Sequence, residues 1–157
     1  MRLLAISAVF WFLLDQVSKA LVLHWAGLLE RGVIEVFPPF LVFKLGYNTG
    51  INFGLLAGGP EVTRWLLVAI ALAISAWLLW WARTGLSRSI ALASAGAVIG
   101  GALANALDRV LFGAVVDFLN MSCCGIDNPY AFNVADIGIV AGALGLLVFA
   151  DPPKKET

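Results

Sequence analysis

Four long apolar stretches divide the sequence, and each is long enough to cross a lipid bilayer as a helix. They cover residues 3–25, 62–82, 89–112 and 132–150, and a bilayer core needs about 20 mostly apolar residues in helical form. The composition agrees, because 61% of the residues are hydrophobic and 13% are charged, against about 45–50% and about 25% in soluble domains. We therefore expect an all-α membrane protein, a bundle of four transmembrane helices in one domain of residues 1–157.

Basic residues beside these stretches predict how the helices are oriented. Short cytoplasmic flanks of membrane proteins carry an excess of Lys and Arg. Such residues stand before the first stretch, between the second and third, and after the fourth: Arg2, Arg83, Arg88, Lys154 and Lys155. The connection 113–130 contains neither Lys nor Arg. We therefore expect both termini in the cytoplasm and the other two connections outside.

The first outer connection, residues 26–59, has the composition of strands. Two runs rich in β-branched and aromatic residues, 33–37 and 40–45, are separated by Pro38 and Pro39 and followed by several glycines. The open backbone hydrogen bonds of a sheet are not tolerated in hydrocarbon. We expect a small extracytoplasmic β-rich cradle between the first and second helices, lying at the outer interface.

Ionisable residues inside the apolar stretches are costly and usually face the bundle interior or water. Asp15 and Lys19 are four residues apart, so they share one face of the first helix. Two interpretations stay open: a neutralised pair that holds helices together, or a pair beside a substrate channel.

A polar stripe marks the third stretch. Gly101, Asn105 and Arg109 recur at intervals of four, and Asp108 adjoins Arg109. Close helix packing with an Asn-mediated hydrogen bond explains the glycine and the asparagine. It does not explain an arginine and an aspartate near the outer end of a span.

Asp117 follows the third stretch, and Asp136 lies in the first turn of the fourth. Taken singly, Asp136 could complement the helix N-terminus, worth about 0.3–1 kcal/mol, and Asp117 could be an ordinary loop acid. The predicted topology places both at a similar depth near the outer face. Two carboxylates sharing a site titrate as a unit, so one can accept a proton from water while the other donates one. This pair is the one complete set of catalytic groups that we find in the sequence.

The sequence lacks the motifs of other hydrolases, of zinc sites and of nucleic-acid-binding proteins. The sole histidine, His24, is in no HExxH motif, and no GxSxG elbow is present. Cys123 and Cys124 are adjacent and lack the spacing of a zinc site; they are either small interfacial hydrophobes or a redox or lipidated pair. No basic face points to nucleic acid. We expect no metal, no cofactor and no nucleic-acid partner.

Five motifs in order resemble those of the lipoprotein signal peptidase family, also called signal peptidase II. They are residues 15–19 (DQVSK), 48–54 (NTGINFG), Gly101 through Asn105 to Asp108 and Arg109, residues 116–118 (VDF) and residues 132–136 (FNVAD). The resemblance implies an aspartic endopeptidase that removes the signal peptide from diacylglyceryl-modified prolipoproteins, cutting before the lipidated cysteine. Asp117 and Asp136 would be its catalytic residues.

The same resemblance implies further roles and partners. Residues that bind substrate or support the site would be Asp15, Lys19, Asn48, Gly50, Asn105, Asp108, Arg109 and Asn133. Membrane lipid and globomycin-type inhibitors would be further partners of a protein that we expect to be a monomer. The chain would lie in the bacterial inner membrane with its active site near the periplasmic face.

Two other kinds of function stay open. Asn52 stands where the family commonly has a small residue, and the Cys123–Cys124 pair is unusual, which leaves room for a divergent paralogue or a non-catalytic membrane subunit that binds lipoprotein precursors. Such a subunit would tolerate the loss of an aspartate. A small proton-coupled transporter would use Asp15 and Asp108 as relay groups and should drive pH-dependent uptake into proteoliposomes.

Overall fold

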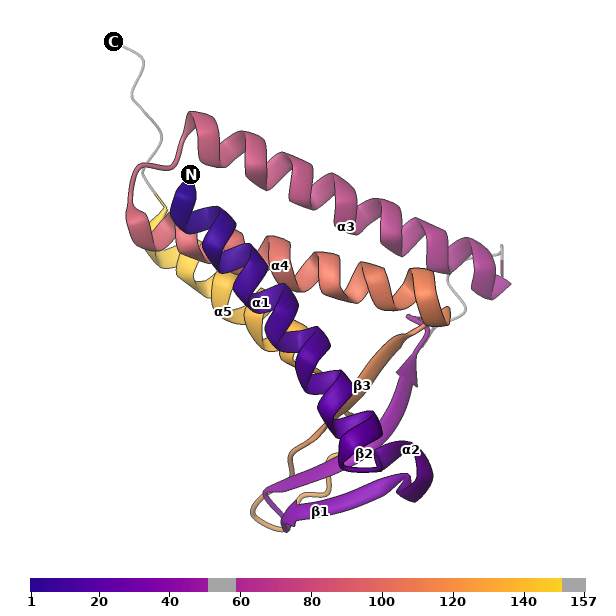
Figure 1. Ribbon diagram of the computed structural model, residues 1–157. Helices are drawn as coiled ribbons and strands as arrows, with labels where there is room; N and C mark the ends of the chain where they lie inside the picture. Colours follow the sequence, from indigo (N-terminus) through magenta and orange to yellow (C-terminus); the bar gives the residue numbers. More distant parts are fainter. Residues whose placement is uncertain (51–58, 151–157) are drawn as a thin grey trace.

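The computed structural model describes residues 1–50 and 59–150, which form long helices and a few short strands (Figure 1). A π-helical segment, η1, extends the first helix. In chain order the elements are α1 (Arg2–Ala20), η1 (Leu21–Trp25), α2 (Leu28–Arg31), β1 (Val33–Phe37), β2 (Leu41–Asn48), α3 (Gly59–Thr84), α4 (Ser89–Phe112), β3 (Val115–Asn120) and α5 (Val134–Phe149).

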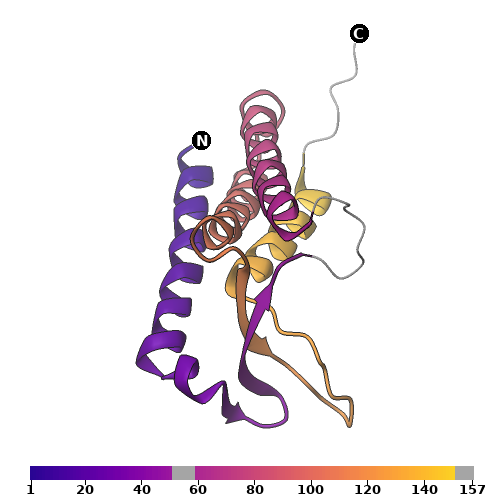
Figure 2. The same ribbon diagram turned by 90° about the vertical axis from the view of Figure 1, so that its right-hand side faces the viewer.

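Helix α4 is the centre of the helical layer and packs against α1, α3 and α5 (Figures 1 and 2). Its most apolar 18-residue window is 61% buried, against 22% for the corresponding windows of α1 and α3. Small residues permit this close packing of helices on α4. A Cβ at Gly100 would overlap the backbone of Ala8 on α1. A Cβ at Gly101 would lie 2.5 Å from the carbonyl oxygen of Ala135 on α5. The two neighbouring glycines thus bring two different helices close to α4.

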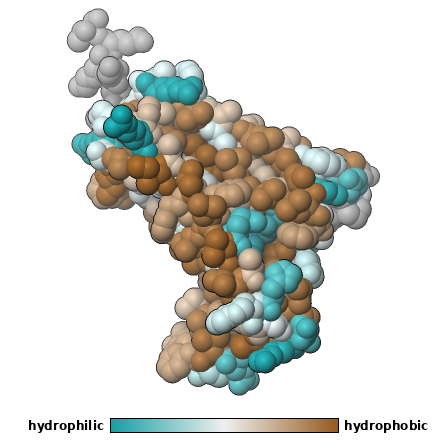
Figure 3. All heavy atoms as spheres, viewed as in Figure 1, coloured by the Kyte–Doolittle hydropathy of each residue, from teal (hydrophilic) through white to brown (hydrophobic). Residues whose placement is uncertain are grey.

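Many exposed side chains of the helices are apolar, as contact with lipid requires, and apolar residues dominate the face in Figure 3. Three helical segments are long and apolar enough to cross a membrane by length and composition: Arg2–Trp25, Glu61–Thr84 and Ser89–Phe112. Helix α5 is also apolar but has 16 residues. It is shorter than the expected 132–150, because Phe132 is extended and pairs with Leu119, and Asn133 caps the helix. Lys154 and Lys155, which follow this helix in the sequence, lie outside the described residues.

The cradle is a three-stranded antiparallel sheet in the order β1-β2-β3. Its first two strands come from the expected segment, but β3 comes from the connection between α4 and α5, where the sequence predicts no strand. Residues 28–31 form a helical turn instead of extended chain. Phe118 of β3 is 2% exposed and packs in one cluster with Leu23 of η1 and Leu28 of α2, so the sheet packs on η1 and α2.

The helix ends opposite the sheet gather the N-terminus, the α3–α4 connection and the end of α5 (Figure 1). The sheet lies beyond the other ends of α1 and α4 in both views (Figures 1 and 2). The chain therefore has one purely helical end and one end where helices and sheet meet.

Replacing Gly100 with alanine should destabilise the protein by about 1–3 kcal/mol, the usual cost of overpacking. The added methyl group would overlap the backbone of Ala8. The unfolding midpoint of the purified protein in detergent measures the loss. The control is Ile74→Ala on the exposed surface of α3, which should stay within about 0.5 kcal/mol of the unchanged protein. Equal midpoints for the two variants would show that Gly100 does not set the α1–α4 distance.

Candidate active site

Asp136 is held by the N-terminus of α5. Asn133 is the N-cap residue, and its Oδ1 accepts a hydrogen bond from the backbone N–H of Asp136 at 3.0 Å. The Asp136 Oδ2 accepts in return from the backbone N–H of Asn133 at 3.2 Å. This reciprocal capping box satisfies two amides that a helix start would leave unpaired. The orientation of the Asp136 carboxylate is therefore set by local sequence.

Asn133 also joins this carboxylate to Asp117, which lies on β3 and is 4% exposed. The Asn133 Nδ2 donates to Asp117 Oδ1 at 2.7 Å and to Asn105 Oδ1 at 3.1 Å. The Asn105 Nδ2 donates to Asp136 Oδ1 at 2.9 Å. Two asparagines from α4 and the start of α5 thus connect the two acids, which are distant along the chain, in one hydrogen-bonded network.

Lys19, Asp15 and Asp108 form a buried triad of charged residues next to this network. The Lys19 Nζ lies 2.6 Å from Asp15 Oδ2 on its own helix and 2.6 Å from Asp108 Oδ2 on α4. Both carboxylates are 0% exposed and Lys19 is 4% exposed. The Gln16 Nε2 adds a hydrogen bond to Asp108 Oδ1 at 2.9 Å. Of the two interpretations of Asp15 and Lys19, this geometry agrees with a pair that holds helices together.

The triad also accepts hydrogen bonds from the two segments that carry Asp117 and Asp136. Asp15 Oδ1 accepts from the backbone N–H of Ala135 at 2.8 Å, and Asp108 Oδ2 accepts from that of Val116 at 3.1 Å. Ala135 directly precedes Asp136, and Val116 directly precedes Asp117. One buried lysine therefore connects, through two carboxylates, the backbone beside both acids.

The end of β2 brings the next motif to the same place. The backbone N–H of Gly50 donates to Asn48 Oδ1 at 2.9 Å. Gly50 has a φ of +76°, and a Cβ there would overlap Leu67 on α3. The close approach and the left-handed backbone both require glycine. Residues 51–54 of this motif, Asn52 among them, lie outside the described residues.

Arg109 extends the stripe of Gly101 and Asn105 toward the site. Its Nη1 donates to the backbone oxygen of Asn105 at 3.3 Å. Its Nε is buried and has no hydrogen-bond partner among residues 1–50 and 59–150. A guanidinium carries five donors, so Arg109 retains the capacity to bind a further acceptor.

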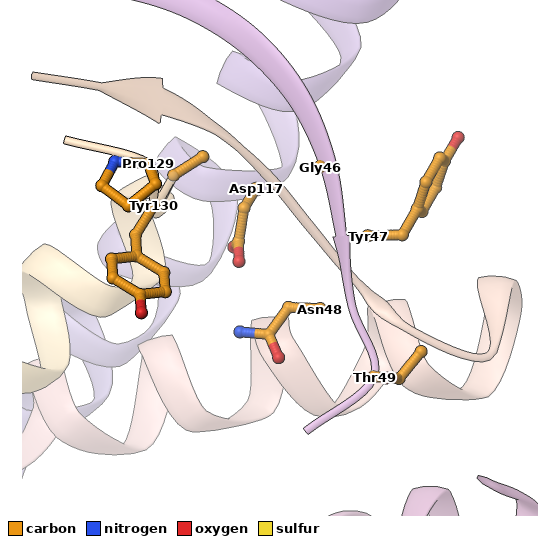
Figure 4. Close-up of a pocket in the computed structure, with 8 residues that line it drawn as sticks. Gly46, Tyr47, Asn48, Thr49, Asp117, Pro129 and Tyr130 are labelled. Carbon is orange, nitrogen blue, oxygen red and sulfur yellow. The ribbon is translucent and has the colours of Figure 1, made fainter. Parts of the chain in front are cut away.

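Two pockets adjoin the acids. One, of about 220 Å³, lies between the end of β2 and residues 129–131. Figure 4 shows Asp117, Asn48 and Tyr130 projecting into the space between these segments, while Tyr47 points away. The other, of about 440 Å³, is an almost wholly apolar groove along α5. It is lined by Phe132, Asp136, Ile137, Val140, Ala141 and Leu144.

The environment of Asp117 suits proton transfer near neutral pH. Burial, and then the charge of Asp136, raise the pKa of Asp117 from 3.8 to about 6. Hydrogen bonds from Asn48 and Asn133 oppose this rise, as does the charge of Lys19. A carboxyl group with a pKa near the working pH can both hold and release a proton, as an acid–base catalyst must.

The structure thus brings together every described residue that the sequence analysis singled out for the site. It adds four that sequence reasoning missed: Gln16, Tyr130 and the amides of Val116 and Ala135. The signal for Gln16 was its polar side chain within an apolar span, next to Asp15. Backbone amides carry no sequence signal, and neither does Tyr130 at the pocket wall.

Comparisons with known proteins agree on one family. The family described as Signal peptidase (SPase) II matches residues 7–150. A lipoprotein signal peptidase of Methylobacterium sp. (strain 4-46) is 45% identical over 143 residues, 90% of this chain and 84% of the relative. That of Rhodopseudomonas palustris (strain ATCC BAA-98 / CGA009) is 41% identical over 150 residues, 93% of this chain and 90% of the relative. A solved structure of a bacterial membrane enzyme, 29% identical, matches with a TM-score of 0.78 over 97% of this chain and 92% of its own.

Replacing Lys19 with methionine should cost about 3–5 kcal/mol of stability at neutral pH, because two buried carboxylates lose their cation. Unfolding in detergent measures the loss. Lys44→Met is the matched control, since Lys44 is exposed on β2, and it should change stability by less than about 0.5 kcal/mol. Equal losses in the two variants would contradict the proposed role of the triad.

Replacing Asn48 with alanine should raise the pKa of Asp117, because the variant lacks a hydrogen bond that stabilises the charged form of this carboxyl group. Infrared titration of the carboxyl band, assigned with an Asp117→Asn sample, measures this pKa. Thr49→Ala, in the same pocket, should leave it unchanged. An unshifted pKa in the Asn48 variant would exclude this hydrogen bond.

The raised pKa of Asp117 also makes the stability of the fold depend on pH. Because this pKa is higher in the folded chain than the 3.8 of the free group, protonation of Asp117 stabilises the fold fully below pH 3.8. This stabilisation is lost as the pH rises through about 6.

Proposed function

The chain belongs to the signal peptidase II family of aspartic peptidases, and we propose that Asp117 and Asp136 are the pair with which it cuts. It is an aspartic endopeptidase of the lipoprotein signal peptidase type. The observation that carries the assignment of the two residues is the Asn133–Asn105 network, which ties both carboxylates into one hydrogen-bonded unit.

The two acids take different roles in the proposed mechanism. Asp117, with its raised pKa, holds the proton. Two hydrogen bonds, from Asn105 Nδ2 and the backbone N–H of Asn133, stabilise negative charge on Asp136 at the helix N-terminus. The ionised Asp136 takes a proton from water, which attacks the peptide carbonyl. Asp117 donates its proton to the carbonyl oxygen, which gives a tetrahedral diol. As the carbon–nitrogen bond breaks, Asp136 passes the proton that it took from water to the leaving nitrogen, and one hydroxyl of the diol returns a proton to Asp117.

Arg109 and Asn48 orient the substrate in this proposal. The buried Nε of Arg109 lacks a partner among the described residues, and a peptide carbonyl is a suitable acceptor. Asn48 lines the polar pocket beside Asp117. Each would hold the peptide backbone while the Asp117–Asp136 pair, the catalytic dyad, reacts with one carbonyl.

The substrate is a prolipoprotein whose cysteine carries diacylglycerol. We propose that its apolar parts occupy the groove along α5 and that the chain beyond the cut passes through the polar pocket beside Asp117. The groove side chains Val140 and Leu144 are each 58% exposed, so lipid-borne groups can reach them sideways from the outer leaflet. The sheet and residues 113–130 would then close over the peptide and exclude water.

The proposed setting is the bacterial inner membrane, with four spans and both termini in the cytoplasm. In support, Arg83 and Arg88 flank the connection at the purely helical end, together with the N-terminus. The acids then lie near the periplasmic face. We further propose that the enzyme works as a monomer and that globomycin-type inhibitors compete for the same site.

The alternatives have less support. Membership of the peptidase family does not favour a subunit that only binds precursors. A transporter would need Asp15 and Asp108 as free relay groups, whereas both are buried and paired with Lys19.

Asp117→Asn and Asp136→Asn should each lower the cleavage rate by at least about 100-fold, the low end of what acid–base groups contribute. The gel shift of a diacylglyceryl-modified precursor, with purified enzyme in detergent, measures cleavage. Asp127→Asn is the control, because Asp127 is an exposed acid of the same outer connection, and it should cut at the normal rate. Unfolding midpoints verify that each variant is folded. Full turnover by either folded dyad variant would overturn the assignment.

A further inference from the structure

Two adjacent thiols lie outside the active site and take no part in the proposed mechanism. Cys123 and Cys124 are exposed and free, and their sulfur atoms lie 2.8 Å apart. Cys123 pairs with Ile126 across a two-residue turn. The central residues of that turn, Cys124 and Gly125, have φ angles of 58° and 80°. Two successive positive φ angles are typical of a type I′ hairpin turn.

The backbone of this turn is unusual for its sequence. Cys124 is the one non-glycine residue with a positive φ in the described part of the chain. The left-handed conformation costs a residue with a Cβ roughly 1–2 kcal/mol, and glycine, asparagine or aspartate normally occupies it. The side chain is exposed, so core packing does not demand a cysteine there. Such strain at an accessible position points to a use of the side chain itself.

The turn is presented from a fixed base. The Asn120 Nδ2 donates to the backbone oxygens of Asn128 at 2.7 Å and Tyr130 at 2.8 Å, which closes the loop. The backbone N–H of Asn128 donates to Ser122 Oγ at 3.0 Å. These bonds hold the strands of the turn together, so the two thiols are kept side by side while exposed to solvent.

We propose that Cys123 and Cys124 form a reversible dithiol–disulfide site that exchanges electrons with external disulfides. The thiolate of one cysteine attacks a sulfur of the external disulfide, forms a mixed disulfide and releases the first thiol. The second cysteine, deprotonated, attacks the mixed disulfide, closes the Cys123–Cys124 bond and releases the second thiol. The two cysteines lose two electrons and two protons, and the external disulfide becomes two thiols.

The adjacency of the cysteines favours a bond that opens again. Consecutive Cα atoms are about 3.8 Å apart, closer than the roughly 4.4–6.8 Å usual in disulfides. Strained and exposed disulfides are the readily reduced ones. The site is therefore suited to cycling between its two states, whereas a permanent cross-link would join residues farther apart.

Intact mass spectrometry of the full chain in detergent, after incubation with oxidised glutathione, tests the proposal. The expected product has lost two hydrogen atoms, carries no glutathione, does not react with maleimide, and regains both thiols in dithiothreitol. Chains that keep glutathione, that dimerise through disulfides or that remain unmodified would overturn it.

Single variants separate the two steps of the exchange. Cys123→Ser and Cys124→Ser should each stop at the mixed disulfide with one glutathione per chain. Gly125→Val, which disfavours the positive φ of the turn, should form the mixed disulfide normally and close the ring more slowly than the unchanged protein. Ring closure at an unchanged rate in this variant would show that the turn does not position the thiols. Because mass is the readout, these results are independent of peptidase activity.

Discussion

The buried ion pairs of Lys19 are the interaction on which the rest of the site depends. A charge inside a membrane span is costly unless it is paired and hydrogen-bonded. Here one cation neutralises Asp15 and Asp108 on two helices, and these carboxylates also accept the amides of Ala135 and Val116. The same contacts that permit the charges in the bundle therefore position the backbone before Asp117 and before Asp136. Helix association and active-site geometry have a common cause.

Close packing around α4 is the condition for these contacts. Lysine can bridge α1 and α4 only if the helix backbones approach closely, and Gly100 provides that approach on one side. Gly101 does the same for α5, which brings Asn105 within 2.9 Å of Asp136. Helix α4 thus combines small residues that set the distances to its neighbours with polar residues that bond across those distances.

The sequence was informative wherever a local period determines the arrangement. The four-residue spacing from Gly101 to Arg109 predicted one face of α4, and the outward ends of two spans predicted that Asp117 and Asp136 belong to the same end. Strand β3 was missed, because its partner β2 precedes α3 and α4 in the chain and no local pattern reports such long-range pairing. The start of α5 was placed too early, since the pairing of Phe132 with Leu119 is also long-range. The double role of Asn133 as helix cap and as bridge between the acids depends on that same pairing and was beyond a local reading.

If Asp117 and Asp136 cut as a pair, their carboxyl groups act on one substrate atom. A crystal structure of the protein bound to a lipopeptide, with a secondary alcohol in place of the scissile carbonyl, tests it most directly. We expect the hydroxyl oxygen to lie within hydrogen-bond distance, about 2.6–3.2 Å, of both carboxyl groups. A hydroxyl that contacts one carboxyl group while the other faces a separate cavity would contradict it.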